Sequence, residues 1–134
     1  MKFQPDTLEG VNTITRHDGT RLWVGAQPFS HSVLVPWMGA VQAWPAATLA
    51  DLTAAHFEQV LQLQPEVVIF GSGQRLSFVP PALMLCLIDQ RIGVETMDTA
   101  AACRTYNVLV AEGRSVLAAL LLAPAAQPAT KPAP

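Results

Sequence analysis

The chain has 134 residues, of which 51% are hydrophobic and 13% are charged, and its net charge is −2 at pH 7. That length suits one domain, and that balance excludes a wholly disordered chain. Eight basic side chains are scattered among ten acidic ones, which argues against a nucleic-acid partner. Cys86 and Cys103 form no CxxC or Cys/His pattern, so we expect no metal site and no disulfide.

The start of the sequence is not expected to be a targeting signal. The first residues lack the apolar segment of a secretory signal, and no apolar stretch approaches the roughly 20 residues that cross a bilayer. We therefore expect no membrane insertion, a cytoplasmic location and a bacterial source. Residues 124–134 contain only Ala, Pro, Gln, Thr and Lys, a composition that predicts a disordered tail after a single domain over 1–123. Truncation after Ala123 should leave the melting temperature nearly unchanged.

The first third of the chain is predicted to be rich in β-structure. Residues 13–17 alternate in polarity, and Asp18-Gly19 is a strong hairpin signal before a second strand over 22–24. Another strand is expected over 29–35, ending before Pro36, and a short one over 41–44.

Strands and helices alternate in the rest of the sequence, which predicts an α/β fold with a mixed sheet. Thr48 and Asp51 resemble a capping box, and the continuous apolar run after Pro65 is typical of a central strand covered on both faces. The predicted elements are a helix over 48–63, the central strand over 67–70, a wholly apolar helix over 80–91, a strand over 94–97, a helix over 98–113 and a last buried strand over 115–122.

A loop of small polar residues follows the central strand directly. It consists of Gly71, Ser72, Gly73 and Gln74. Ligands of open α/β sheets bind beyond the carboxyl ends of strands, where glycines let backbone N–H groups approach an anion. The loop lacks the third glycine of a dinucleotide fingerprint and the lysine of a P-loop. It is therefore either a ligand pocket or only a tight turn leaving a buried strand.

A second candidate segment begins at Asp98, the predicted cap of the third helix. If the strands over 67–70 and 94–97 are parallel neighbours, Thr99 faces the Gly71 loop across a crevice whose free N–H groups favour an anionic or carbonyl ligand. Arg104 and Asn107 share one side of the helix, and one or the other is expected to reach toward the same space. The alternative is that Asp98 is only a cap, Arg104 a surface ion-pair donor and Asn107 a buried hydrogen-bonding residue.

No catalytic motif or cofactor-binding motif is present in the sequence. Cys103 lies near a helix start, where a thiol pKa falls, but a core cysteine is the favoured interpretation. His56 is expected to pack on the apolar side of its helix. Trp37-Met38-Gly39 would leave apolar surface for a partner.

Four segments of the sequence together match a known pattern. They are Val67–Gly73, Gly93–Thr99, Ala102–Leu109 and Glu112–Val116. These segments resemble a family of small uncharacterised proteins that includes the mitochondrial NADH dehydrogenase (complex I) assembly factor 3. The resemblance runs from about Ile14 to Leu122, and Arg104–Asn107 is its most specific part. Gly71–Gly73 departs from the Gly-Thr-Gly of the family by one exchange that preserves the hydroxyl. The resemblance implies a three-layer α/β domain with a mixed sheet, no established activity and no cofactor.

Two functions remain open at this point. The first is a non-catalytic binding or assembly protein, linked by the resemblance to respiratory complex assembly and free to form a homo-oligomer. The second is a small-molecule or anion-binding domain, or an unrecognised enzyme, that uses the crevice at Gly71–Gln74. Because no catalytic motif is present and the charge content is low, we expect the first.

Overall fold

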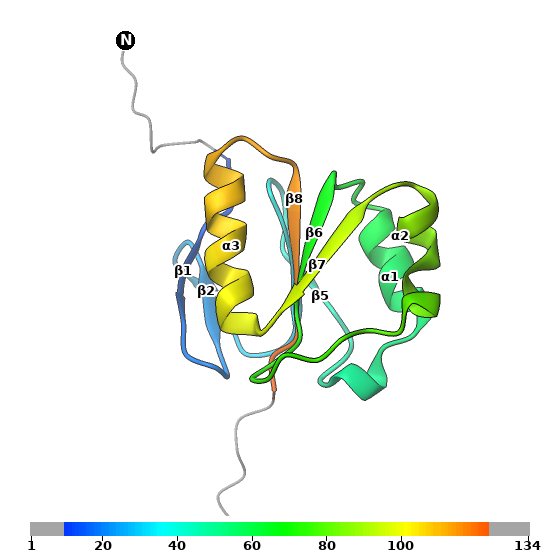
Figure 1. Ribbon diagram of the computed structural model, residues 1–134. Coiled ribbons are helices and arrows are strands. Elements are labelled where there is room, and N and C mark those ends of the chain that lie inside the picture. Colours follow the sequence, from blue (N-terminus) through cyan, green and yellow to red (C-terminus); the bar gives the residue numbers. More distant parts are fainter. Residues whose placement is uncertain (1–9, 124–134) are drawn as a thin grey trace, which may run out of the picture.

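The computed structural model describes residues 10–123 and confirms the expected α/β fold with a mixed sheet (Figure 1). The tail expected over 124–134 lies outside the described residues. The main sheet has the strand order β5-β4-β8-β6-β7. Its strands are β4 (Val33–Pro36), β5 (Gln42–Ala43), β6 (Val67–Gly71), β7 (Gly93–Met97) and β8 (Val116–Leu120).

The predicted central strand occupies the position that its apolar sequence indicates. β6 pairs in parallel with β8 on one side and with β7 on the other, while β4 runs antiparallel to β8. Val68, Ile69 and Phe70 have no exposed surface. A strand covered on both faces needs apolar side chains at successive positions, which explains the continuous run in the sequence.

The main sheet is the middle of three layers (Figure 1). One face is covered by α3 (Thr99–Ala111) and by a second, three-stranded sheet. The other face is covered by α1 (Ala54–Leu61), α2 (Leu85–Asp89) and two short 3₁₀ helices, Leu49–Asp51 and Pro81–Met84. The three-stranded sheet consists of β1 (Ile14–His17), β2 (Leu22–Val24) and β3 (Gln27–Phe29).

Alternate side chains of the main sheet build two separate cores. Ile69 packs in the same buried cluster as Cys103 and Tyr106 of α3. Phe70, the next residue, points to the other face, where it meets the indole of Trp44 edge-on at a centroid distance of 6.0 Å. Trp44 also packs edge-on against Phe57 at a centroid distance of 5.7 Å, and aromatic pairs prefer this arrangement.

The prediction of one continuous helix over 48–63 is wrong. The backbone at Leu52 is extended (φ −75°, ψ 140°), so a 3₁₀ turn ends there and α1 begins after Thr53. Each piece has its own cap. The Asp51 carboxylate accepts from the N–H of Thr48 at 3.1 Å, and Nδ1 of His56 accepts from the N–H of Thr53 at 3.0 Å. The second cap was missed because histidine is not a usual partner in a capping box.

Two further predictions need correction. The strand expected over 29–35 is divided between β3 and β4, which belong to different sheets. β3 includes Pro28, which an edge strand tolerates, and β4 includes Pro36 as its last residue, although the strand was expected to end before it. The helix expected over 80–91 is a 3₁₀ turn followed by the short α2, in which Leu85 is 53% and Ile88 48% exposed. This helix is therefore not buried all round.

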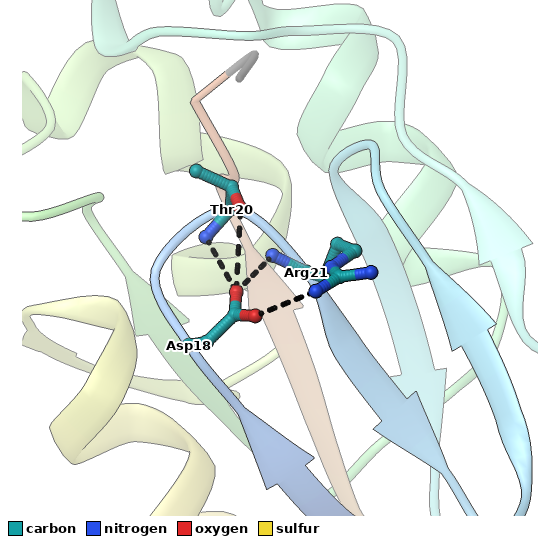
Figure 2. Close-up of polar contacts among 3 residues, drawn as sticks. All are labelled: Asp18, Thr20 and Arg21. Atoms are coloured by element: carbon teal, nitrogen blue, oxygen red, sulfur yellow. Dashed lines mark hydrogen bonds and ion pairs between the residues drawn. The ribbon is translucent and has the colours of Figure 1, made fainter. Parts of the chain in front are cut away.

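The hairpin predicted at Asp18-Gly19 joins β1 to β2, and the Asp18 carboxylate holds its turn (Figure 2). Oδ1 accepts from the N–H of Thr20 at 3.2 Å and from the N–H of Arg21 at 2.9 Å, while Oδ2 pairs with Nη2 of Arg21 at 3.2 Å. These backbone hydrogen bonds, aided by the guanidinium, lower the pKa of Asp18.

Asp18→Ala should lower the melting temperature at neutral pH and lose that effect in acid. Because the folded-state pKa lies below the unfolded value, the stabilisation is fully present above the unfolded pKa of about 3.9 and is lost as the pH falls through the folded pKa. The measurement is thermal unfolding of the wild type and the variant across this range. A difference between the two proteins that stayed constant down to the lowest pH would contradict the role of the carboxylate.

Candidate functional site

The loop after β6, the start of α3 and the tip of the β1–β2 hairpin enclose a cleft of about 220 Å³ at one edge of the main sheet. Gly73, Gln74, Asp98 and Thr99, all predicted site residues, line it. The remaining lining residues are His17, Gly19, Ala100 and Leu122.

The loop and the helix start lie side by side, as the sequence predicted, but they are in direct contact and do not face each other across a crevice. The N–H of Thr99 donates to the carbonyl of Gly73 at 2.8 Å, and the N–H of Gly73 donates to Oγ1 of Thr99 at 2.9 Å. Gly71 lies so close that an added Cβ would be 2.9 Å from both Cα and Oγ1 of Thr99. The reason is the parallel pairing of β6 with β7, which brings their carboxyl ends to the same edge.

The polar groups of this junction are largely committed to each other, so the expected set of free N–H groups is not found. Oγ1 of Thr99 also donates to the carbonyl of Leu121 at 2.8 Å. Oγ of Ser72 donates to the carbonyl of Arg75 at 2.6 Å and accepts from the N–H of Ser77 at 3.0 Å. These hydrogen bonds satisfy the junction internally and fix the loop to α3 and to the end of β8.

The first turn of α3 is likewise capped from within the chain. Oδ1 of Asp98 accepts from the N–H of Ala101 at 2.8 Å, and the carbonyl of Asp98 accepts from Ala102 at 2.9 Å. With the N–H of Thr99 bound to Gly73, only Ala100 of this turn has an N–H without an acceptor in residues 10–123. Asp98 is thus a helix cap that also borders the cleft.

Asn107 does not reach the cleft, contrary to the prediction. Its Oδ1 accepts from the N–H of Ile14 at 2.9 Å, and its Nδ2 donates to the carbonyl of Ile14 at 2.7 Å. The side chain therefore acts as a two-point clamp that joins α3 to the start of β1. The prediction failed because the clamp spans 93 positions of sequence, and no local pattern identifies its partner.

Tyr106 forms a second connection beside this clamp. Its hydroxyl lies 2.8 Å from the carbonyl oxygen of Asn12 and 3.0 Å from that of Pro36. Burial of this ring and its hydroxyl raises the pKa of Tyr106. Arg104 is exposed, lines no part of the cleft and forms no ion pair within residues 10–123. The most specific part of the resemblance thus includes two residues that hold the fold together.

The sequence did not identify His17, Gly19 and Leu122 as neighbours of the cleft. The Asp18-Gly19 signal located a hairpin turn, but a turn signal is local and cannot show where the hairpin tip lies. The strand predicted over 115–122 ended at Leu122, two residues beyond the end of β8 at Leu120, and the prediction gave no neighbour for Leu122. The side-chain nitrogen Nε2 of Gln74 lies 3.6 Å from the position that a Cβ on Gly19 would occupy. The tip of the β1–β2 hairpin therefore lies against the loop after β6.

Gly73 has its own conformational requirement. Its φ is +105°, and an added Cβ would meet nothing within 4 Å. A valine there would be strained by the backbone rather than by its neighbours. Gly73→Val is therefore a poor probe of the cleft, because any loss of binding would come with a loss of stability.

The two cysteines pack in or against the cores of the protein, and His56 is hydrogen-bonded to the backbone. Both thiols are free, and they lie on opposite sides of the main sheet, Cys103 in the α3 core and Cys86 at the edge of the α1–α2 core. Burial raises the pKa of Cys103 to about 12 and, less strongly, that of Cys86. His56 is half-buried, and its Nε2 lies 2.8 Å from the carbonyl oxygen of Pro45.

Thiol labelling of the native protein should be slow at Cys103 and faster at Cys86. Only the thiolate reacts, and Cys103 combines a raised pKa with 1% exposure, whereas Cys86 is half-buried. Mass spectrometry after timed exposure to iodoacetamide measures both rates, and the unfolded protein serves as the reference. Equal rates at the two sites in the native state would contradict the assigned burial.

Within residues 10–123 we find no group of three or more His, Cys, Asp or Glu side chains that could hold a metal ion. None of the helices described here is long and apolar enough to cross a bilayer.

Comparison with known proteins settles the family. The family described as "Protein of unknown function (DUF498/DUF598)" matches residues 14–121. This chain belongs to that family. NADH dehydrogenase (ubiquinone) 1 alpha subcomplex assembly factor 3 of Bos taurus is 33% identical over 102 residues, which is 75% of this chain and 54% of the relative. The chain thus spans about half the length of this relative.

Solved structures agree with the fold. A crystal structure from Bordetella parapertussis is 40% identical, with a TM-score of 0.81, and the match covers 86% of this chain and 98% of the other. A solution structure from Bordetella pertussis, described as a Mth938-like domain, is 33% identical with a TM-score of 0.79 over 92% and 94% of the two chains. A protein from Bartonella henselae, described as an outer membrane protein, is 29% identical with a TM-score of 0.75 over 85% and 97%.

Proposed function

We propose that this protein is a non-catalytic binding protein that acts in the assembly of a respiratory NADH dehydrogenase through contacts with other proteins. The observation that carries the proposal is the homology to assembly factor 3 across most of the described domain. A cytoplasmic location and a bacterial source, both expected from the sequence, belong to the same proposal.

The chemistry of the candidate residues supports a binding role over a catalytic one. Ser72 and Thr99 have hydroxyls that are engaged with backbone groups on both their donor and acceptor sides. Burial keeps the Cys103 thiol protonated at neutral pH, and the pKa of Tyr106 is also raised. A nucleophile needs a lowered pKa or an adjacent base, whereas the pKa values of Cys103 and Tyr106 are raised and the hydroxyls of Ser72 and Thr99 are bonded to backbone groups.

The test is quantitative affinity capture of the tagged full-length chain from its native cells after mild chemical crosslinking. We expect enrichment of subunits of the NADH dehydrogenase over an untagged strain, and crosslinks that map to this domain. Cell fractionation on the same samples checks the cytoplasmic location, and size-exclusion chromatography of the pure protein checks for a homo-oligomer. Enrichment of metabolic enzymes in place of dehydrogenase subunits would count against the proposal.

A second candidate function is supported by the cleft itself. His17, Gln74 and Asp98 supply polar side chains at its border, and its volume of about 220 Å³, below the roughly 300–1,000 Å³ of drug-sized ligand sites, limits it to a small metabolite or ion. Native mass spectrometry of the gently purified protein would detect a retained ligand. His17→Ala and Gln74→Ala should abolish retention if the cleft binds it, and retention that persists in both variants would exclude this site.

A further inference from the structure

The three-stranded sheet has one buried face and one exposed face that meet different environments. Ile14, Leu22 and Val24 point inward and pack in the core shared with α3. On the outward side, Trp23 of β2 stands between Arg16 of β1 and Pro28 of β3, its register partners on the two neighbouring strands. Arg16 and Pro28 are exposed and Trp23 is half-buried. No element within residues 10–123 covers this outward face.

Two arginines stack on the half-buried indole. The guanidinium carbon of Arg16 lies 4.5 Å from the centroid of the Trp23 ring, and that of Arg21 lies 5.1 Å away. Stacking orients a guanidinium without using its N–H groups, so these donors remain free for a carboxylate. Arg16 takes part in neither of the two ion pairs formed within residues 10–123. Arg21 forms an ion pair with Asp18 at the hairpin turn (Figure 2). We call Arg16, Arg21 and Trp23 the arginine–tryptophan face.

The charge of the chain is distributed unevenly along its sequence. Residues 10–50 contain two arginines and one acidic residue, Asp18, whose carboxylate is engaged in the turn. Residues 51–123 contain four arginines and seven acidic residues. The arginine–tryptophan face therefore carries one positive charge beyond the Arg21–Asp18 pair, in a chain whose net charge is −2, and complementary charge favours an acidic partner.

We propose that the arginine–tryptophan face binds an acidic segment of a partner protein, with carboxylates on the guanidinium donors of Arg16 and Arg21 and an apolar side chain against Trp23. Arginine and tryptophan are enriched where a few residues carry most of the binding energy of an interface. This inference rests on the proposed function as a protein-binding factor and names the surface and the chemistry of the partner.

The test is titration of the ¹⁵N-labelled full-length protein with a short oligoglutamate peptide containing one leucine, followed by NMR. We expect the side-chain signals of Arg16, Arg21 and Trp23 and the amide signals of β1 and β2 to shift, with an affinity that falls as salt is added. Arg16→Glu should weaken binding roughly tenfold or more, since it reverses one of two contacting charges. Arg104→Glu, the same charge reversal at an exposed helical position, should leave binding unchanged.

Three results would overturn the proposal. They are the absence of shifts at saturating peptide, equal losses in Arg16→Glu and Arg104→Glu, and binding to anionic phosphatidylglycerol vesicles or to a second copy of the chain in place of the peptide. Sedimentation of the protein with such vesicles and alone distinguishes the last two. The titration requires no dehydrogenase, so a failed titration would contradict the proposed surface without contradicting the role in assembly. A failed affinity capture would contradict the role in assembly without contradicting peptide binding at this surface.

Discussion

Gly71→Ala is expected to lower the free energy of unfolding by about 2–3 kcal/mol, in the range of overpacked sites. The new methyl group would lie 2.9 Å from backbone and side-chain atoms of Thr99 and 3.0 Å from Cδ2 of Leu120. A flexible side chain can yield, but the Cα of Thr99 belongs to a helix start that is hydrogen-bonded to Gly73 and Leu121. Urea unfolding of the purified variant measures the effect.

Gly93→Ala is the matched control for this prediction. Gly93 begins the neighbouring strand β7, and an added Cβ there would meet nothing within 4 Å. We expect its stability to stay within about 0.5 kcal/mol of the wild type, as for surface substitutions in general. Equal destabilisation of the two variants would show that loss of glycine, and not the contact with Thr99, is responsible.

Asn107→Ala should lower the free energy of unfolding by about 2 kcal/mol. It removes both hydrogen bonds that join α3 to Ile14 and leaves the part-buried N–H and carbonyl of Ile14 without these partners. Amide hydrogen exchange should then accelerate in β1 and β2 more than in β6 and β8, because the clamp holds the three-stranded sheet to the rest of the domain. Denaturant unfolding together with exchange measured by NMR tests both parts.

Arg104→Ala, one turn earlier on the same helix, is the control. The side chain is exposed and unpaired within residues 10–123, so we expect little change in stability. If Arg104→Ala and Asn107→Ala instead impaired binding of a small ligand with no change in stability, the two residues would form a ligand site as the sequence first indicated, and the clamp would be a minor feature.

The sequence was most informative where structure depends on local pattern. The continuous apolar run over 67–70 correctly indicated the central strand, and Asp18-Gly19 correctly indicated a hairpin. The break in the helix at Leu52 was missed because the apolar spacing continues across it while the extended backbone of one residue ends the hydrogen bonding. Periodicity reports which side chains face the core, and it does not report the backbone at one residue.

The candidate site was only half predictable for a related reason. The meeting of Gly73 with Thr99 follows from the pairing of parallel strands, which the sequence suggests through two strand-loop-helix units. The contact between Asn107 and Ile14 and the position of the hairpin tip depend on how the three-stranded sheet packs on α3. That packing joins residues more than 90 positions apart, and no spacing rule within one segment contains it.

The most direct test of a role in assembly is the amount of mature respiratory NADH dehydrogenase in cells that lack this protein. Native gel electrophoresis of membranes, with an activity stain and quantitative mass spectrometry of the bands, separates the mature enzyme from subassemblies. We expect the mature enzyme to fall several-fold while subassemblies accumulate and succinate dehydrogenase stays constant, and we expect the wild-type gene to restore it. Mature enzyme at the normal level, with no accumulated subassembly, would contradict the proposed function.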